Sequence, residues 1–260
     1  MRIATWNING VRARAENLRV WLRDVGPDVV CLQEIKCTEE TFPREALDGL
    51  GYNIAICGQK GFNGVAILSK RPLEDVTTGL PGHDDDAQAR YIEATVSTDG
   101  GTVRIASIYL PNGNPISSDR FAYKLAWLDR LEAHARDRLA LEEPLVLAGD
   151  YNVIPQPEDA RRPEAWVNDA LYQPDSRHRF RAIIHLGLTD AVRTCDDGDG
   201  LFTFWDYQGG AWQKDDGIRI DHLLISPQAA DLLMGAGIDR AVRSWEKPSD
   251  HVPAWIELNI

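Results

Sequence analysis

Carboxylate, amide and imidazole side chains recur where apolar, strand-like runs of this sequence end. In the stretch EKPSDHVPAWIEL, Asp250 and His251 directly precede apolar residues at alternate positions, the period of a β-strand. One acid at such a place is ordinary turn chemistry. Because six strand-like runs carry such residues, we expect one polar crater at the edge of a sheet sandwich. Its members are Asn7, Asn9, Gln33, Glu34, Tyr109, Asn112, Asp150, Asn152, Asp221, Asp250 and His251.

These side chains suit a hard divalent cation. Oxygen ligands from Asp, Glu and Asn are those that Mg²⁺ and Mn²⁺ prefer, whereas a zinc site would use more His or Cys. Asp150 and Asn152 lie two residues apart, so on an extended backbone their side chains point the same way. The chemistry that such a crater would support is hydrolysis assisted by a metal ion.

The elements that must position these residues are strands and hairpins separated by helices. Alternating or continuous apolar runs predict strands at 2–8, 28–34, 144–152, 218–226 and 251–258, and hairpins at 52–70 and 89–110. Helical periodicity appears at 11–26, 119–141 and 180–192. In the second of these helices Phe121, Leu125, Leu128 and Leu131 share a face, whereas 155–180 shows no clear pattern.

Hairpins that alternate with helices argue against a purely parallel sheet. They predict an α/β fold in which sheets pack face to face and helices lie outside. No linker or low-complexity stretch divides the chain, so we expect one domain over residues 1–260. PDVVCLQE and PLVLAGDYN each lead a buried strand into polar residues, a faint echo that suggests two similar halves.

The composition is that of a globular chain, with 43% hydrophobic and 26% charged residues. Its longest apolar runs are too short to span a bilayer, so no membrane partner is expected. The N-terminus enters a strand pattern without the features of a signal peptide. The cysteines form no CxxC pair, and three of them lie in or beside apolar runs; they are Cys31, Cys37, Cys57 and Cys195. We expect a cytoplasmic protein.

The net charge of −12 counts against a nucleic-acid partner, because most such proteins carry a basic surface. The objection weakens if the acids hold a cation that itself contacts phosphate. Basic residues are concentrated at Arg12, Arg14 and Arg19 and in RHRFR at 177–181. A basic stripe on an acidic body and a merely solvated charged face are both open at this point.

Seven blocks along the chain resemble the signature blocks of the exonuclease III family. They are ATWNINGVRA, PDVVCLQEIK, GQKGFNGVAILSK, IYLPNG, LAGDYNV, RIDHLLIS and SDHVP, in this order. Members of that family are magnesium-dependent abasic-site endonucleases and 3′-exonucleases. The resemblance implies a four-layered α/β sandwich with two central mixed β-sheets flanked by helices. It also implies a DNA repair nuclease acting on double-stranded DNA with abasic sites or blocked 3′ ends.

The resemblance also implies roles for the crater residues. Glu34 is the main expected ligand of Mg²⁺ (or Mn²⁺), with Asn7 beside it and Asp250 near a second position. Asp150 aligns or deprotonates the attacking water, and Asp221 orients His251 against the scissile phosphate. The expected catalytic set is Tyr109, Asp150, Asn152, Asp221 and His251. The expected metal-binding set is Asn7, Glu34, Asp150, Asn152, Asp250 and His251.

Further residues are expected to contact the substrate. Phosphate-backbone contacts are assigned to Arg90, Asn112, Lys124 and the 177–181 segment that begins at Arg177. Phe204 and Trp205 resemble an aromatic pair that walls a pocket for a flipped-out abasic sugar, with ordinary core packing as the alternative. The segment YQPDSRHRF departs from the family pattern, which leaves the balance between abasic incision and exonuclease activity open.

Two other functions compete with this one. The same fold could act on a phospholipid headgroup or an inositol phosphate, which the net charge favours slightly. A non-catalytic scaffold is the third reading, but such a protein would be expected to lose acids from the crater, and none of the expected ones is missing. A monomer is the default expectation, because the sequence shows no coiled-coil pattern.

Overall fold

Two six-stranded sheets form the centre of the computed structural model, which describes residues 1–260. The first sheet has the order β11 (Leu233–Ile238), β12 (Ala254–Leu258), β1 (Arg2–Asn7), β2 (Val29–Gln33), β4 (Val65–Ser69) and β3 (Asn53–Cys57). The second has the order β5 (Glu74–Thr78), β6 (Tyr91–Thr98), β7 (Gly101–Tyr109), β8 (Leu145–Asp150), β10 (Asp221–Ile225) and β9 (Thr189–Asp190).

The two sheets repeat one topology. In the first, β1 and β2 are parallel and the crossover between them contains α1 (Ala15–Val25). In the second, β7 and β8 are parallel and the crossover contains α2 (Asp119–Leu139). All other pairs are antiparallel, so both sheets are mixed. The echo between PDVVCLQE and PLVLAGDYN corresponds to β2 and β8, the second strand of each parallel pair.

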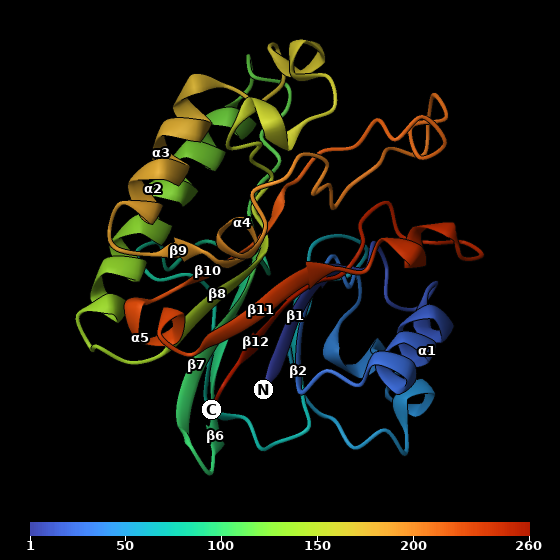
Figure 1. The fold of residues 1–260 in the computed structure, drawn as a ribbon, viewed down its shortest axis with the longest axis vertical. Coiled ribbons are helices and arrows are strands. Elements are labelled where there is room, and N and C mark those ends of the chain that lie inside the picture. Colours follow the sequence, from blue (N-terminus) through green and yellow to red (C-terminus); the bar gives the residue numbers. More distant parts are fainter.

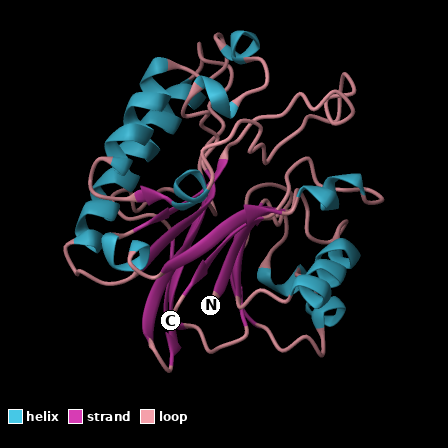
Figure 2. Cartoon of the chain, in the orientation of Figure 1, coloured by secondary structure: helices cyan, strands magenta, loops and turns pink.

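Helices cover the outer faces of the sheets, which gives four layers (Figures 1 and 2). The inner faces share one apolar core, in which Ile3 and Cys31 of the first sheet and Ile105 and Val146 of the second are fully buried. A second core lies between the first sheet and α1, and a third between the second sheet and α2 with α3 (Pro174–Ile184). The predicted architecture is confirmed.

The helix boundaries follow from capping residues. α1 ends where Gly26 takes a left-handed conformation, φ 60°, and its N–H reaches the carbonyl of Leu22. Ser118 caps the N-terminus of α2, and its side chain accepts a hydrogen bond from the N–H of Arg120. The remaining helices are short, namely α4 (Ala191–Cys195), α5 (Pro227–Ala230) and 3₁₀ turns at Glu39–Thr41, Arg44–Leu47, Pro157–Asp159, Pro163–Trp166 and Arg240–Ser244.

Three details of the sequence-based assignment are wrong. The buried face of α2 consists of Lys124, Trp127, Leu128, Leu131, His134 and Ala135, whereas Phe121 and Leu125 are half-buried. The helix expected at 180–192 is the end of α3 followed by β9 and α4, because Gly187 at φ 116° breaks it. The segment that showed no pattern contains most of α3, which starts with Pro174 at a position where the missing N–H costs nothing.

The chain ends lie together at one end of the first sheet, where the terminal ammonium of Met1 donates to the carbonyl of Leu258 at 2.6 Å (Figure 1). The four cysteines are free; Cys31 and Cys37 are buried, Cys57 is half-buried and Cys195 is exposed. None of the helices combines the length and apolar character needed to cross a membrane.

Candidate active site

Strand register brings the predicted crater residues to one edge of the sandwich. Asp150, the last residue of β8, lies opposite Tyr109 of β7 on one side and Asp221 of β10 on the other. Asn7 ends β1 in the facing sheet, opposite Gln33 of β2. Because every one of these strands has an end at the same edge, residues separated by up to about 240 positions become neighbours.

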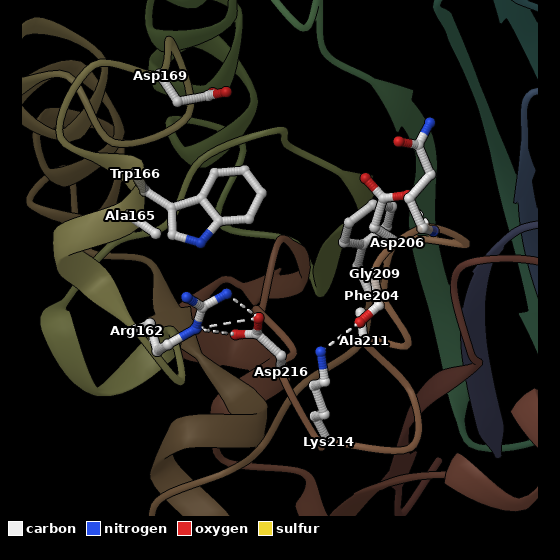
Figure 3. Close-up of a pocket in the computed structure, with 11 residues that line it drawn as sticks. Arg162, Ala165, Trp166, Asp169, Phe204, Asp206, Gly209, Ala211, Lys214 and Asp216 are labelled. Atoms are coloured by element: carbon white, nitrogen blue, oxygen red, sulfur yellow. Dashed lines mark hydrogen bonds and ion pairs between the residues drawn. The ribbon is translucent and has the colours of Figure 1, made fainter.

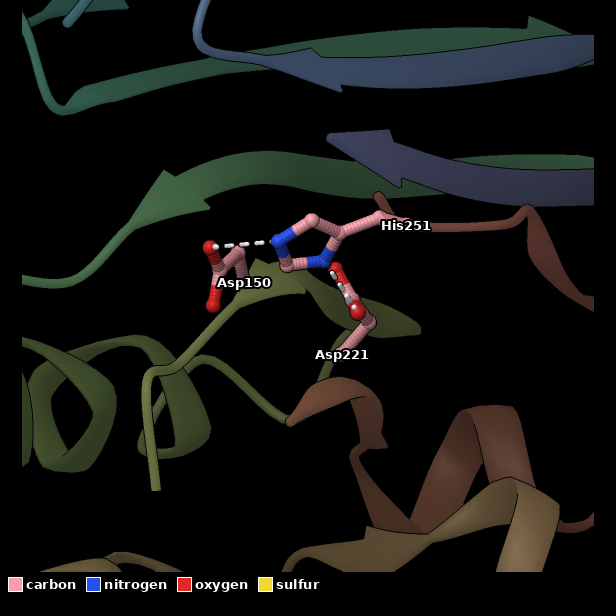
Figure 4. Close-up of side chains that lie close together, drawn as sticks. All are labelled: Asp150, Asp221 and His251. Carbon is pink, nitrogen blue, oxygen red and sulfur yellow. Dashed lines mark hydrogen bonds and ion pairs between the residues drawn. The ribbon is translucent and has the colours of Figure 1, made fainter. Parts of the chain in front are cut away.

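His251 and two carboxylates form the buried centre of the crater (Figure 4). Asp221 Oδ2 lies 2.8 Å from His251 Nδ1, and Asp150 Oδ2 lies 3.8 Å from His251 Nε2 on the opposite side of the ring. All three residues are less than 5% exposed. The second oxygen of Asp221, Oδ1, is buried and has no hydrogen-bond partner in the protein.

The charges of this centre stabilise one another. Burial lowers the pKa of His251, but the carboxylates of Asp221 and Asp150 outweigh burial and raise the pKa to about 10. Burial raises the pKa of Asp150, and the imidazolium of His251 limits that rise. At neutral pH, His251 is therefore an imidazolium with an N–H on each ring nitrogen; Nδ1 donates to Asp221, Nε2 has no hydrogen-bond partner in the protein, and Asp150 is a carboxyl group with raised proton affinity.

Asn7 connects Asp150 to Glu34. Its Nδ2 donates to Glu34 Oε1 at 3.0 Å and to Asp150 Oδ2 at 2.9 Å. Glu34 follows β2 in a left-handed conformation, φ 50°, which costs a residue with a side chain roughly 1–2 kcal/mol. This conformation re-aims the carboxylate directly after the strand. Burial acts to raise the pKa of Glu34, but the Lys36 ammonium, 2.7 Å from Oε2, and the Asn7 bond lower it.

Asp250 faces away from its neighbour His251. Its Oδ1 accepts a hydrogen bond from Asn9 Nδ2 at 3.0 Å, and Asn9 Oδ1 in turn accepts one from Lys36 Nζ at 2.5 Å. Adjacent residues in the sequence thus serve different parts of the crater. That Asp250 serves a metal ion and His251 the scissile phosphate stays a prediction.

The crater residues fit a hard divalent cation. Asp150, Asp221 and His251 each present a ligand atom within 4.8 Å of the others, and the unpartnered Oδ1 of Asp221 is a buried acceptor that a cation or an ordered water would satisfy. An imidazolium has no lone pair to offer, so in this protonation state His251 is a donor and the oxygen atoms remain as ligands. Of the expected set, Asn7, Glu34 and Asp150 are directly linked.

Asn152 and Asn112 stand side by side at the next part of the crater. Asn112 Nδ2 donates to Asn152 Oδ1 at 3.2 Å, and the N–H of Asn152 donates to Asp150 Oδ1 at 2.9 Å. The backbone of Asn152 adopts a left-handed conformation, φ 47°, which asparagine tolerates better than most residues.

Lys124 does not take the role expected from the sequence. Its side chain is fully buried, and Nζ donates to the carbonyls of Asn112 at 3.0 Å and Asn152 at 2.5 Å. Burial lowers the pKa of Lys124 to about 7, although Asp150 and Asp169 act in the other direction. The predicted DNA contact at Lys124 is therefore corrected: the ammonium ties together the two loops that carry the asparagines.

Tyr109 and Arg90 form a stacked pair at the rim. The guanidinium of Arg90 lies 4.8 Å from the centre of the Tyr109 ring, and its Nη1 donates to the Tyr109 carbonyl at 3.2 Å. Burial and the carboxylates of Glu34 and Asp150 raise the pKa of the Tyr109 phenol. The phenol is therefore neutral and can donate a hydrogen bond.

A cleft of about 470 Å³ lies between the loop that carries Trp166 and the loop that carries Phe204 (Figure 3). Phe204 lines it and packs edge-on against the imidazole of His251, with the ring centres 5.0 Å apart. Trp166 lines it as well, and Arg162 pairs with Asp216 in it. Trp205 is absent from the lining and fully buried in the core beside α1, so its assignment to the pocket wall is wrong.

Sequence reasoning missed Trp166 and placed Arg177 only roughly. Trp166 ends a 3₁₀ turn inside the stretch that has no periodic pattern, so the only signal was an aromatic residue in a polar loop. Arg177 is half-buried, stacks 4.5 Å above the Tyr172 ring and donates from Nε to the carbonyl of Pro155 at 3.0 Å. That leaves the terminal nitrogens of Arg177 without a fixed partner.

Known proteins resemble this chain in sequence and in fold over nearly all of its length. Residues 4–251 match the Endonuclease/Exonuclease/phosphatase family. Exodeoxyribonuclease III of Haemophilus influenzae is 32% identical over 99% of this chain and 100% of its own. An AP endonuclease from Archaeoglobus fulgidus has a TM-score of 0.94 with 33% identity and complete coverage of both chains. The 3′-5′ exonuclease NExo from Neisseria meningitidis has a TM-score of 0.94 with 38% identity and complete coverage.

Proposed function

Because the chain belongs to the Endonuclease/Exonuclease/phosphatase family, we propose that it is a divalent-metal-dependent DNA repair nuclease. It hydrolyses the phosphodiester 5′ to abasic sites, and it removes nucleotides or blocking groups from the 3′ ends of double-stranded DNA. The observation that carries the proposal is the position of Asp150, held between the Asn7–Glu34 pair and the His251–Asp221 pair. The similarity to the nucleases described above supports the same proposal.

The crater supplies each group that phosphodiester hydrolysis requires. Glu34, Asn7 and Asp150 would hold Mg²⁺ or Mn²⁺, with Asp250 near a second position, and the bound ion would place positive charge on a phosphoryl oxygen. Asp150, whose pKa burial raises, orients the attacking water and accepts its proton. The His251 imidazolium donates to the other side of the phosphate, where negative charge develops in the transition state.

Two neutral donors complete the arrangement. Asn152 Nδ2 gives one N–H to the Leu110 carbonyl at 2.9 Å, and its second N–H is the one proposed to donate to a phosphoryl oxygen. The Tyr109 phenol donates to the phosphate or to the leaving oxygen as a neutral group, since its raised pKa keeps it protonated. Arg90, Asn112 and Arg177 are proposed as contacts to the DNA backbone.

The cleft that Trp166 and Phe204 line is the proposed place of the abasic sugar or of the 3′-terminal nucleotide. Phe204 joins this cleft to the reaction centre, because it lines the cleft and touches the imidazole. An abasic sugar is cheap to extrude from the duplex, since no base pair has to open. All of the proposed groups come from one chain, so we propose a monomer as the working form; the cytoplasmic location stays a prediction from the sequence.

The test is incision of a labelled duplex that contains one central abasic-site analogue, compared with an intact blunt duplex, each with Mg²⁺ and with chelator. We expect magnesium-dependent cutting 5′ to the analogue. In His251→Gln or Asp221→Asn, turnover should fall by about 100-fold or more. Turnover within a few-fold of wild type would remove the pair from the mechanism. Cutting of neither duplex, with release of phosphate from an inositol phosphate or a phospholipid, would refute the DNA substrate.

A further inference from the structure

A second, smaller cleft lies beside Asn112 and contains no acidic side chain. Its volume is about 270 Å³, and its polar lining consists of Gln88, Arg90, Asn112, Asn114, Arg120 and Tyr123. The whole protein carries a net charge of −12, so a cleft with two guanidiniums and no carboxylate stands out from the surface around it. Such a lining favours an anionic ligand.

The two arginines differ in how they are held. Arg90 is fixed, because Nε donates to Gln88 Oε1 at 2.8 Å, Nη1 donates to the Tyr109 carbonyl and the guanidinium stacks on the Tyr109 ring. The side chain of Arg120 is exposed and has neither an ion-pair nor a side-chain hydrogen-bond partner. The Arg90 guanidinium is thus in place before any ligand binds, whereas the Arg120 side chain is free to move onto the bound ligand.

Two acids that contact the lining have partners of their own. Asp86 accepts a hydrogen bond from the Tyr123 hydroxyl at 2.9 Å and forms an ion pair with Arg130 at 2.8 Å, and Asp169 accepts a hydrogen bond from Asn114 Nδ2 at 3.0 Å. Neither acid forms an ion pair with Arg120. Arg120 also lies in the first turn of α2, a helix of 21 residues, where the partial positive charge of the helix end adds to that of the guanidinium.

The lining and position of the cleft indicate which anion it takes. Arg90 and Arg120 offer only donors, in the fork geometry that matches the oxygens of a phosphate group. It shares Asn112 with the loop next to Asn152, and through Arg90 it adjoins Tyr109. A phosphate bound here is close to the reaction centre without being the group that is cut.

We propose that this cleft binds a non-scissile backbone phosphate of the DNA, close in sequence to the cleavage point, with Arg120 and Arg90 on either side of it. The inference rests on the proposed function and adds Arg120 to the residues that bind substrate. The Arg120 side chain moves onto the phosphate as the DNA binds. Because Arg90 is stacked on the Tyr109 ring, a phosphate bound to Arg90 is held at a fixed position relative to Tyr109. The cleft thus sets where along the strand the scissile bond lies.

The experiment compares Arg120→Gln with Arg71→Gln in duplex incision at several salt concentrations. Arg71 is also an exposed arginine, but it follows β4 at the edge opposite the crater, so it controls for the loss of one positive charge. We expect Arg120→Gln to raise KM about 3- to 10-fold with kcat little changed, and to reduce the salt slope of kcat/KM by about one. Arg71→Gln should change neither quantity.

A second measurement locates the phosphate. Neutral methylphosphonates are placed one at a time along the cut strand, outside the scissile position. At one position, the methylphosphonate should raise the KM of the wild-type protein. At the same position it should leave the KM of Arg120→Gln unchanged. The proposal is overturned if the two effects add at every position, if the salt slope is unchanged, or if kcat falls while KM stays constant.

Failure of the proposed function would look different. If wild type cuts no DNA, that function fails, and binding of a labelled duplex in chelator, followed by fluorescence anisotropy, still tests the cleft. Weaker binding and a smaller salt slope in Arg120→Gln, but not in Arg71→Gln, would support the phosphate site. Equal behaviour of the two variants, or no binding by wild type, would refute it.

Discussion

The Asp221→Asn substitution removes one negative charge next to His251 and leaves the shape of the side chain nearly unchanged. Asp221 and His251 are both buried, and Asp221 Oδ2 lies 2.8 Å from His251 Nδ1. Asp221 and Asp150 together raise the pKa of His251 from 6.5 to about 10. An adjacent opposite charge shifts a pKa by about 1–3 units, which is about 1.4–4 kcal/mol at 1.36 kcal/mol per unit. We therefore expect the substitution to lower the His251 pKa by about 1–3 units.

The same shift predicts how stability depends on pH. The pKa of His251 is higher in the folded than in the unfolded protein, so folding favours proton binding. This contribution is complete below about pH 6.5 and is lost as the pH rises through about 10. Over the whole interval it is of order 5 kcal/mol in wild type. In Asp221→Asn the contribution should be smaller and should disappear at lower pH.

The assay is NMR of protein labelled at histidine, titrated in chelator so that no cation contributes to the shift, together with urea unfolding at several pH values. Asp231→Asn, an exposed site on the α5 side, is the matched control and should leave the His251 titration unchanged. A wild-type His251 pKa near 6.5 would refute the reasoning. An unchanged pKa in Asp221→Asn would show that Asp150, not Asp221, maintains the charge.

Three further predictions follow from the crater. Glu34→Gln should weaken Mg²⁺ binding at least about tenfold, or 1.4 kcal/mol, in calorimetric titration, and unchanged affinity would place the ion elsewhere. In Lys124→Met, kcat should fall because Asn112 and Asn152 lose their shared donor. The contribution of Lys124 to stability should rise between about pH 7 and 10.5, where the unfolded chain binds its proton more tightly, and it opposes the loss of the His251 contribution. In urea unfolding, the stability of wild type relative to Lys124→Met should therefore rise over this interval. Phe204→Ala should raise KM for abasic duplex with little loss of stability, whereas Trp205→Ala should destabilise the fold by about 3–5 kcal/mol; equal melting temperatures of the two variants would contradict these positions.

Local patterns were sufficient for most of the fold. The alternating run at 251–258 and the buried run at 28–34 each place one strand, and Gly26 with Pro27 ends α1 as expected. The pattern failed between 155 and 192. There Arg177, Arg179 and Arg181, all half-buried, interrupt the apolar pattern of α3, and Gly187 interrupts what looked like one continuous helix. The short strand β9 has only two residues, too few to show a period.

The prediction of the site divides in the same way. That Glu34, Asp150 and His251 gather at one edge follows from their places at strand ends, and the structure brings them together. Which of the expected substrate-binding side chains are exposed and which are buried could not be deduced. Lys124 and Trp205 were both assigned to the substrate, yet both are fully buried, because burial depends on what packs against a residue from elsewhere in the chain.

The sequence by itself determined the types of groups in the crater, the strands that carry them and the oxygen-rich chemistry that suits a hard cation. These are local properties, because alternation, capping and ligand type depend on residues close in the chain. Only the tertiary structure decided that Asn7 bridges Glu34 to Asp150, that His251 is held as an imidazolium, and that Arg90 and Arg120 share a cleft without acids. Those facts arise from distances and desolvation between segments far apart in the sequence, and they exist only once the two sheets have packed.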